Sequence, residues 1–144
     1  MIKNDRQYRI TKAQAEKFER AIKEAAVSPR PNVPPALRKA QMDALKSQLA
    51  DLREELEEYN ALRSGRRKTV AIGSLDELLK TLIQARIAGG LTQEELAAKL
   101  GLKPQQIQRY EATEYHSASM DRMKEVLRVL GVRLRRPVEL RLVS

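Results

Sequence analysis

The feature that most constrains the fold is the stretch of residues 74–132, where apolar side chains recur at helical spacing in four short blocks. Three of these blocks begin at a Ser or Thr that can cap a helix and end at a glycine, and the third block begins at Lys103-Pro104. Glycine closes a helix well because it adopts a positive φ without steric cost. The pattern therefore predicts four short helices.

The second and third blocks are separated by only a few residues, so the two helices must cross at a steep angle. Ala97 is small where the helices approach each other, and Gly101 permits the sharp turn, for which we expect a positive φ. Four apolar residues are expected to face inward and hold the angle: Leu96, Leu100, Leu102 and Ile107. This arrangement leaves the opposite side of the third helix exposed.

The run Leu91-Thr-Gln-Glu-Glu-Leu-Ala-Ala-Lys-Leu-Gly-Leu102, followed by Ile107 and Glu111, resembles the helix-turn-helix of the lambda-repressor/Cro class, the XRE family. The resemblance covers Ser74 to Val132 and implies a domain that binds duplex DNA. It implies base readout from an exposed stripe on the third helix, formed by Lys103, Pro104, Gln105, Gln106 and Arg109. Phosphate contacts are expected from Thr92 and Gln93 at a helix N-terminus and from the later loop, at Tyr115, His116 and Ser117.

The chemistry of the exposed stripe suits base recognition. Gln pairs bidentately with adenine and Arg with guanine, each with roughly 1–3 kcal/mol of discrimination. Pro104 departs from the family's polar residue, and it leaves that position to read shape or a thymine methyl group. Arg86 and Glu111 resemble the family's partly buried ion pair, which implies a structural role rather than acid–base chemistry.

The N-terminal part has a different pattern. Thr11 with Gln14 forms a capping-box sequence that predicts a helix start, and the proline-rich segment 28–35 predicts a stiff connector. A second helix is predicted from Pro35 to about Arg63. Its apolar residues form a heptad seam that the first helix, folded back as a hairpin, a second copy of the chain, or both together could cover: Met42, Leu45, Leu49, Leu52, Leu56 and Tyr59.

These observations predict an all-α fold in four parts. Residues 1–64 form a coiled-coil-like helical hairpin for dimerisation or partner binding, 65–73 a basic linker, and 74–132 the helix-turn-helix domain. In the tail, 133–144, the alternation of Val138, Leu140 and Leu142 predicts a short C-terminal β-strand. A second extended segment is predicted at 69–72, where β-branched residues gather.

Composition narrows the function. The net charge is +9 and its excess lies in residues 65–144, which favours a polyanion as partner. The chain has no cysteine, a single histidine and no glycine-rich phosphate loop, so we expect no cofactor, no metal and no enzymatic activity. No apolar run is long enough for a membrane span, and no secretory signal is visible, so we expect a cytoplasmic protein.

Together these features predict a sequence-specific regulator of transcription, a repressor that binds an operator as a homodimer. One alternative is an antitoxin of the HigA kind, whose N-terminal helices would bind a small toxin. Another, from a different functional class, is a helical interaction module for which DNA binding is secondary.

Overall fold

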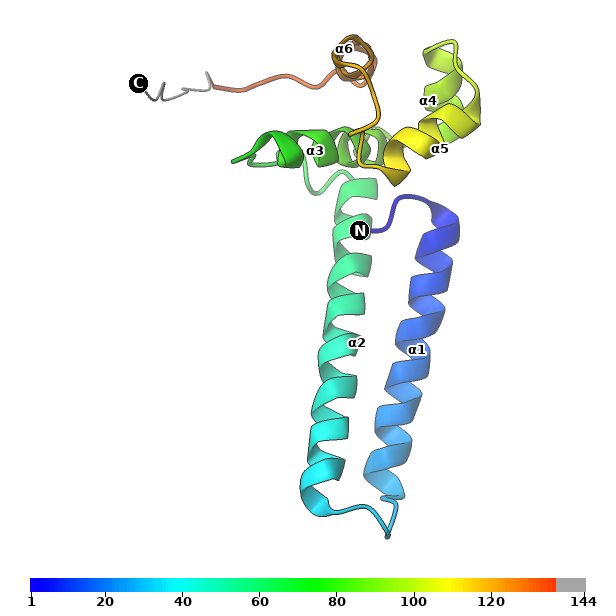
Figure 1. The fold of residues 1–144 in the computed structure, drawn as a ribbon, viewed down its shortest axis with the longest axis vertical. Helices are drawn as coiled ribbons and strands as arrows, with labels where there is room; N and C mark the ends of the chain where they lie inside the picture. Colours follow the sequence, from blue (N-terminus) through cyan, green and yellow to red (C-terminus); the bar gives the residue numbers. More distant parts are fainter. Residues whose placement is uncertain (137–144) are drawn as a thin grey trace. The chain divides into compact units, whose positions relative to one another are not determined.

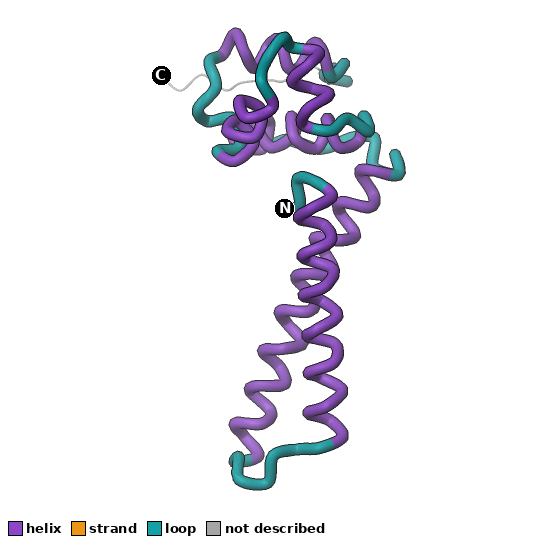
Figure 2. Tube along the Cα trace, turned by 90° about the vertical axis from the view of Figure 1, so that its right-hand side faces the viewer, coloured by secondary structure: helices purple, strands orange, loops and turns teal. Residues whose placement is uncertain are grey.

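The structure is a computed structural model, and it describes residues 1–136. Within this range the chain forms six α-helices and no strand (Figures 1 and 2). The helices divide between two compact units, Met1–Val70 and a second unit that begins at Ala71. No helix in the described range is both long enough and apolar enough to cross a membrane.

The first helix, α1 (Asp5–Val27), begins six residues before the predicted start at Thr11. Its N-cap is Asn4, whose side chain accepts a hydrogen bond from the Gln7 amide at 2.9 Å. Asn is as good an N-cap as Ser or Asp, so the cap at Asn4 lets the helix begin before the Thr11 box. The predicted start was therefore wrong, and Thr11 lies inside the helix.

The second helix, α2 (Pro35–Arg63), has the predicted bounds and lies alongside α1 in the opposite direction (Figure 1). The two helices are joined most closely at the end that holds the start of α1. There Tyr8 stacks on Tyr59 with ring centroids 5.3 Å apart, and the Tyr59 hydroxyl donates to Asp5 at 3.0 Å. Ile2 and Leu62 are buried at the same end, which gives this pair of helices its core.

The predicted seam of α2 is partly covered within a single chain. Leu49 and Tyr59 are buried, and the other four seam residues are half-buried: Met42, Leu45, Leu52 and Leu56. Leu49 and Tyr59 are therefore not available to a second copy, whereas the four half-buried residues keep part of their surface exposed.

The second unit contains four short helices up to residue 136, whose bounds are α3 (Leu75–Ala88), α4 (Gln93–Lys99), α5 (Pro104–Ala112) and α6 (Met120–Val129). Ser74, Thr92 and Ser119 cap α3, α4 and α6 by accepting a backbone N–H, as their sequence positions predict. Ile107 of α5 and Val126 of α6 are fully buried among other side chains of the core, which are Leu79, Leu82, Ile83, Ile87, Leu96 and Ala97.

Neither of the two predicted extended segments forms a strand in the described residues. Residues 69–72 form no strand. They are irregular chain at the boundary between the two units. Residues 133–136 of the tail also form no strand, whereas the alternating part at Val138, Leu140 and Leu142 lies outside the described residues. Within residues 1–136 the fold is therefore entirely helical in its regular structure.

Candidate DNA-binding surface

The turn between α4 and α5 sets the exposure of α5. Gly101 has a φ of +65°, as predicted, and follows the last turn of α4. The Leu102 amide donates to Ala97 O at 2.9 Å and the Gly101 amide to Ala98 O at 3.2 Å, which is the hydrogen-bond pattern of a Schellman motif. Ala97 is fully buried, so a larger side chain there would push the two helices apart.

The two faces of α5 differ sharply. Ile107 and Glu111 are fully buried on one side, whereas Gln105, Gln108 and Arg109 are exposed. Residues three and four apart share a helix face, so Gln105 lies beside both Gln108 and Arg109. Gln108 was not among the residues predicted for base readout, although its position three residues after Gln105 places it on the same helix face.

The first turn of α5 holds the other predicted readout residues. Lys103 is the exposed N-cap, and Pro104 is half-buried at the first helical position. The Gln106 side chain reaches back and accepts a hydrogen bond from the Lys103 amide at 3.0 Å. The cap engages one of the two lone pairs of that oxygen, and adenine pairing uses the same oxygen, so capping of α5 competes with bidentate base pairing by Gln106.

A buried ion pair fixes α5 to α3. Arg86 donates from Nε to Glu111 Oε1 at 2.5 Å and from Nη2 to Oε2 at 2.8 Å, and both side chains are almost completely buried. Arg86 also donates from Nη1 to Leu91 O at 2.8 Å, which holds the loop between α3 and α4. Such a two-point contact restricts the orientation of both helices more than a single hydrogen bond would.

Gln93, the first residue of α4, joins this network. Its Nε2 donates to Glu111 Oε2 at 2.7 Å, and the side chain is half-buried. A carboxylate accepts but does not donate, so the NH₂ end of the Gln93 amide must face Glu111. The amide has two N–H groups, and the contact uses one, so Gln93 keeps a donor for a phosphate beside the N-terminus of α4.

The N-terminus of α4 has a complete capping box. Thr92 Oγ1 accepts from the Glu95 amide at 3.1 Å, and Glu95 Oε2 accepts from the Thr92 amide at 2.7 Å. The Thr92 hydroxyl is therefore already engaged in the cap. The hydrogen bond from the Thr92 backbone lowers the pKa of the Glu95 carboxyl below its usual range.

We expect the Glu95→Gln variant to be less stable than the wild type near neutral pH, and the difference to vanish in acid. A lowered folded-state pKa means that the ionised carboxylate stabilises the fold above its unfolded value of about 4.3. This contribution is lost as the pH falls through the lower folded-state pKa. Urea unfolding at a series of pH values measures it, and a difference that grows in acid would contradict the assignment.

The turn after α5 corrects the predicted phosphate contacts. Tyr115 is completely buried and stacks on Tyr110 with ring centroids 6.0 Å apart, so it cannot contact a phosphate. Burial raises the pKa of its phenol. The side chain turns inward because the Tyr115 amide donates to Tyr110 O at 2.6 Å and closes the helix with a left-handed turn, at φ values of 49° for Glu114 and 64° for Tyr115.

The other two predicted loop residues lie at the surface. His116 is exposed, with Nε2 3.9 Å from the Asp76 carboxylate of α3. Ser117 is exposed as well, and its hydroxyl lies 2.7 Å from the Thr113 hydroxyl. Both residues remain candidates for phosphate contact, with their side chains held near those two neighbours.

We expect Glu114→Gly to stabilise the protein by at most about 1 kcal/mol, because relief of the left-handed strain is partly offset by the backbone entropy that glycine loses on folding. The Lys80–Glu114 ion pair, at 3.7 Å and partly exposed, offsets little of this gain. Thermal unfolding measures the effect, and Lys80→Ala reports the contribution of the ion pair alone. A lower melting temperature in Glu114→Gly would show that the turn is not strained.

The basic residues that precede α3 and those that follow α6 differ in whether they form ion pairs. In the predicted linker, Arg66 pairs with Glu57 at 2.9 Å and Arg67 with Glu58 at 3.1 Å. Their charges are thus partly neutralised by the end of α2. The arginines that follow α6 are exposed and make no salt bridge to a described residue; they are Arg133, Arg135 and Arg136.

Comparison with protein families gives one match within this unit. Residues 82–136, less than half of the chain, match the family model described as helix-turn-helix. Comparison with curated proteins and with solved structures found no match. Residues 82–136 therefore form a helix-turn-helix domain of the XRE type, and this domain supports a role in DNA binding.

Proposed function

We propose that the protein is a sequence-specific transcriptional repressor that reads duplex DNA with the exposed face of α5. The observation that carries the proposal is the division of α5 between a buried side at Ile107 and Glu111 and an exposed polar side at Gln105 and Arg109. A recognition helix needs this division, because the buried side fixes its angle and the exposed side meets base edges in the major groove.

The exposed residues have distinct proposed roles. Gln105 and Arg109 would pair with base edges, while Lys103 lies at the helix start where it can reach a base or a phosphate. Gln93 would contact a phosphate through its second amide hydrogen and the N-terminal amides of α4. Gln106 is given the role of cap, which competes with base reading by the same side chain.

Selection of bound duplexes from a random pool tests the proposal. A shared sequence of a few base pairs in the recovered DNA is expected if α5 reads bases. Recovery of unrelated sequences with equal affinity would leave only non-specific binding to phosphates and would overturn the claim of sequence specificity.

A repressor of this kind would act as a homodimer, because two recognition helices about 34 Å apart meet successive major grooves on one side of the DNA. The recovered sequence should then be palindromic. Native mass measurement of the full chain with the selected duplex is expected to show two chains per site. A single chain on an asymmetric site would remove the dimer from the proposal.

A second candidate is an antitoxin that also regulates its own operon. The observation that favours it is the separate unit Met1–Val70, which forms its own core and leaves the helix-turn-helix domain complete without it. Co-expression with the product of a neighbouring short reading frame tests it. If that product is toxic alone and remains fully toxic in the presence of the chain, the antitoxin role is excluded.

Either role places the protein where the chromosome is, in the cytoplasm and associated with the nucleoid when bound to DNA.

A further inference from the structure

The α1–α2 pair is packed at one end only. Its buried side chains are Ile2, Ala15, Leu49, Tyr59 and Leu62, and none of residues 16–48 is buried. That range contains the second half of α1, the proline-rich connector and the first half of α2. The apolar residues there stay half-covered, including Phe18, Ile22, Met42 and Leu45.

An open cleft of about 1330 Å³ lies in this loosely packed end. Ala21 and Val27 of α1, Val33 of the connector, and Met42 and Leu45 of α2 give it an apolar lining. Its volume exceeds the range of about 300–1,000 Å³ that is usual for small-molecule sites. The size therefore fits a row of side chains from a polypeptide better than a metabolite.

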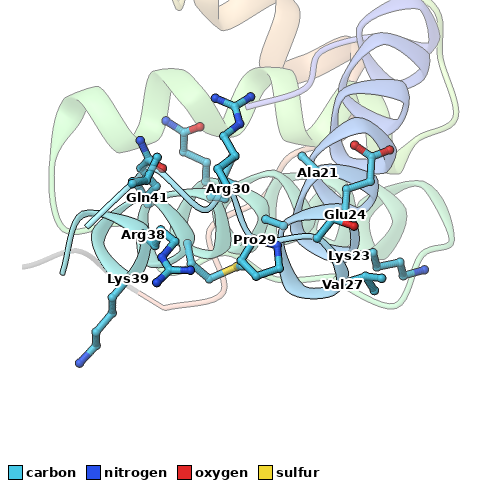
Figure 3. A pocket seen from close by; sticks show the side chains of 16 residues that line it. Ala21, Lys23, Glu24, Val27, Pro29, Arg30, Arg38, Lys39 and Gln41 are labelled. Carbon is cyan, nitrogen blue, oxygen red and sulfur yellow. The ribbon is translucent and has the colours of Figure 1, made fainter. Parts of the chain in front are cut away.

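The rim of the cleft is basic. Lys23, Arg30, Arg38 and Lys39 line it together with a single acid, Glu24 (Figure 3). None of the four basic side chains forms a salt bridge with a described residue, so their charge is available to a partner. In Figure 3 the charged ends of Lys23 and Lys39 point outward from the cleft.

We propose that this cleft binds an acidic amphipathic helix of a partner protein, with apolar side chains between α1 and α2 and carboxylates against the four basic residues. An apolar lining with a cationic rim complements such a helix in both respects. DNA would satisfy the rim but has few apolar groups for the lining. The connector prolines Pro29, Pro31 and Pro34 restrict the backbone of the connector, which lowers the entropy that it loses on binding.

A second copy of the chain is a weaker occupant. Its acidic amphipathic segment is the second half of α2, and that segment is already engaged. Glu57 and Glu58 pair with Arg66 and Arg67 of their own chain, while Tyr59 packs against α1. The proposal thus concerns a different protein and does not depend on the DNA-binding role of α5.

The test uses the full chain and a labelled synthetic helical peptide of about four turns, with Leu on one face and Glu elsewhere. Fluorescence anisotropy should show saturable binding. It should weaken at least about tenfold in Val27→Asp and in Arg38→Glu/Lys39→Glu. Val27 is 83% exposed, so its substitution should leave the fold intact, and unchanged helicity and DNA binding would verify this.

Three controls decide between occupants. Lys12→Glu/Lys17→Glu makes the same change in net charge at exposed α1 positions outside the cleft, and it should leave peptide binding unchanged. A peptide with Lys in place of Glu should not bind. Absence of binding at about 100 μM acidic peptide, equal loss in the control variant, or equal binding of the basic peptide would each overturn the proposal.

Two further outcomes would reassign the cleft. If Arg38→Glu/Lys39→Glu weakened DNA binding while the control variant did not, the rim would belong to the DNA surface. If Val27→Asp converted a dimer into a monomer in sedimentation, the cleft would be an interface between copies. Either result contradicts binding of an acidic partner protein, and neither depends on whether α5 reads sequence.

Discussion

Replacing Glu111 with Gln is expected to destabilise the helix-turn-helix domain by about 3–5 kcal/mol. The substitution removes the negative charge that lies against the Arg86 guanidinium, whose side chain is only 3% exposed. It also disturbs the contact with Gln93, so the N-terminus of α4 should loosen with α5. The loss is comparable to the whole stability of many small domains.

Urea unfolding of the full chain, followed by circular dichroism, measures this effect. Glu94→Gln, at an exposed position in the first turn of α4, is the matched control and should change stability by less than about 0.5 kcal/mol. In Arg86→Met/Glu111→Leu both buried charges are replaced by apolar side chains, so much of the stability should return. A loss below about 1 kcal/mol in Glu111→Gln would show that the pair does not hold the two helices together.

Replacing Gln105 with Ala is expected to weaken binding to the selected operator by about 10- to 100-fold, the equivalent of roughly 1–3 kcal/mol. Gln105 is exposed on α5 beside Arg109 and belongs to neither the helix cap nor the core. Its amide is therefore available for a base edge. Binding to random DNA, which depends on phosphate contacts, should change by less than about twofold.

Titration of both duplexes at one salt concentration measures the two effects. Gln14→Ala removes the same side chain from an exposed position of α1 and should leave both affinities unchanged. Gln106→Ala should instead weaken binding to both duplexes to a similar extent, because its side chain caps the recognition helix. Equal losses on both duplexes in Gln105→Ala would exclude direct readout by this residue.

Local sequence rules predicted much of the second unit. Thr92, Gly101 and Ser119 each meet a backbone requirement that one residue type serves best, so the caps and the turn between α4 and α5 could be predicted. Arg86 and Glu111 could be paired only through the family resemblance, because they come from different helices and no local pattern joins them.

The role of Gln106, the burial of Tyr115 and the start of α1 could not be predicted, because more than one local structure fits the sequence at each of them. Gln106 has the side chain of a base-reading residue, but its amide oxygen accepts a hydrogen bond from the Lys103 backbone within the same turn. Tyr115 looked like a surface residue because it follows a helix in a polar loop, yet a left-handed backbone without glycine turns it into the core. In the first unit, Thr11 offered a stronger start signal than Asn4, but the helix continues back to Asn4 and gains contacts with α2.

We propose that the exposed face of α5 and the N-terminus of α4 contact DNA. Amide chemical shifts of the isotope-labelled full chain, recorded with and without the selected duplex, test it most directly. The largest changes are expected at Thr92, Gln93 and residues 103–109, with smaller ones at His116 and Ser117. Changes confined to α1 and α2, with the amides of α5 unaffected, would show that DNA does not bind at α5.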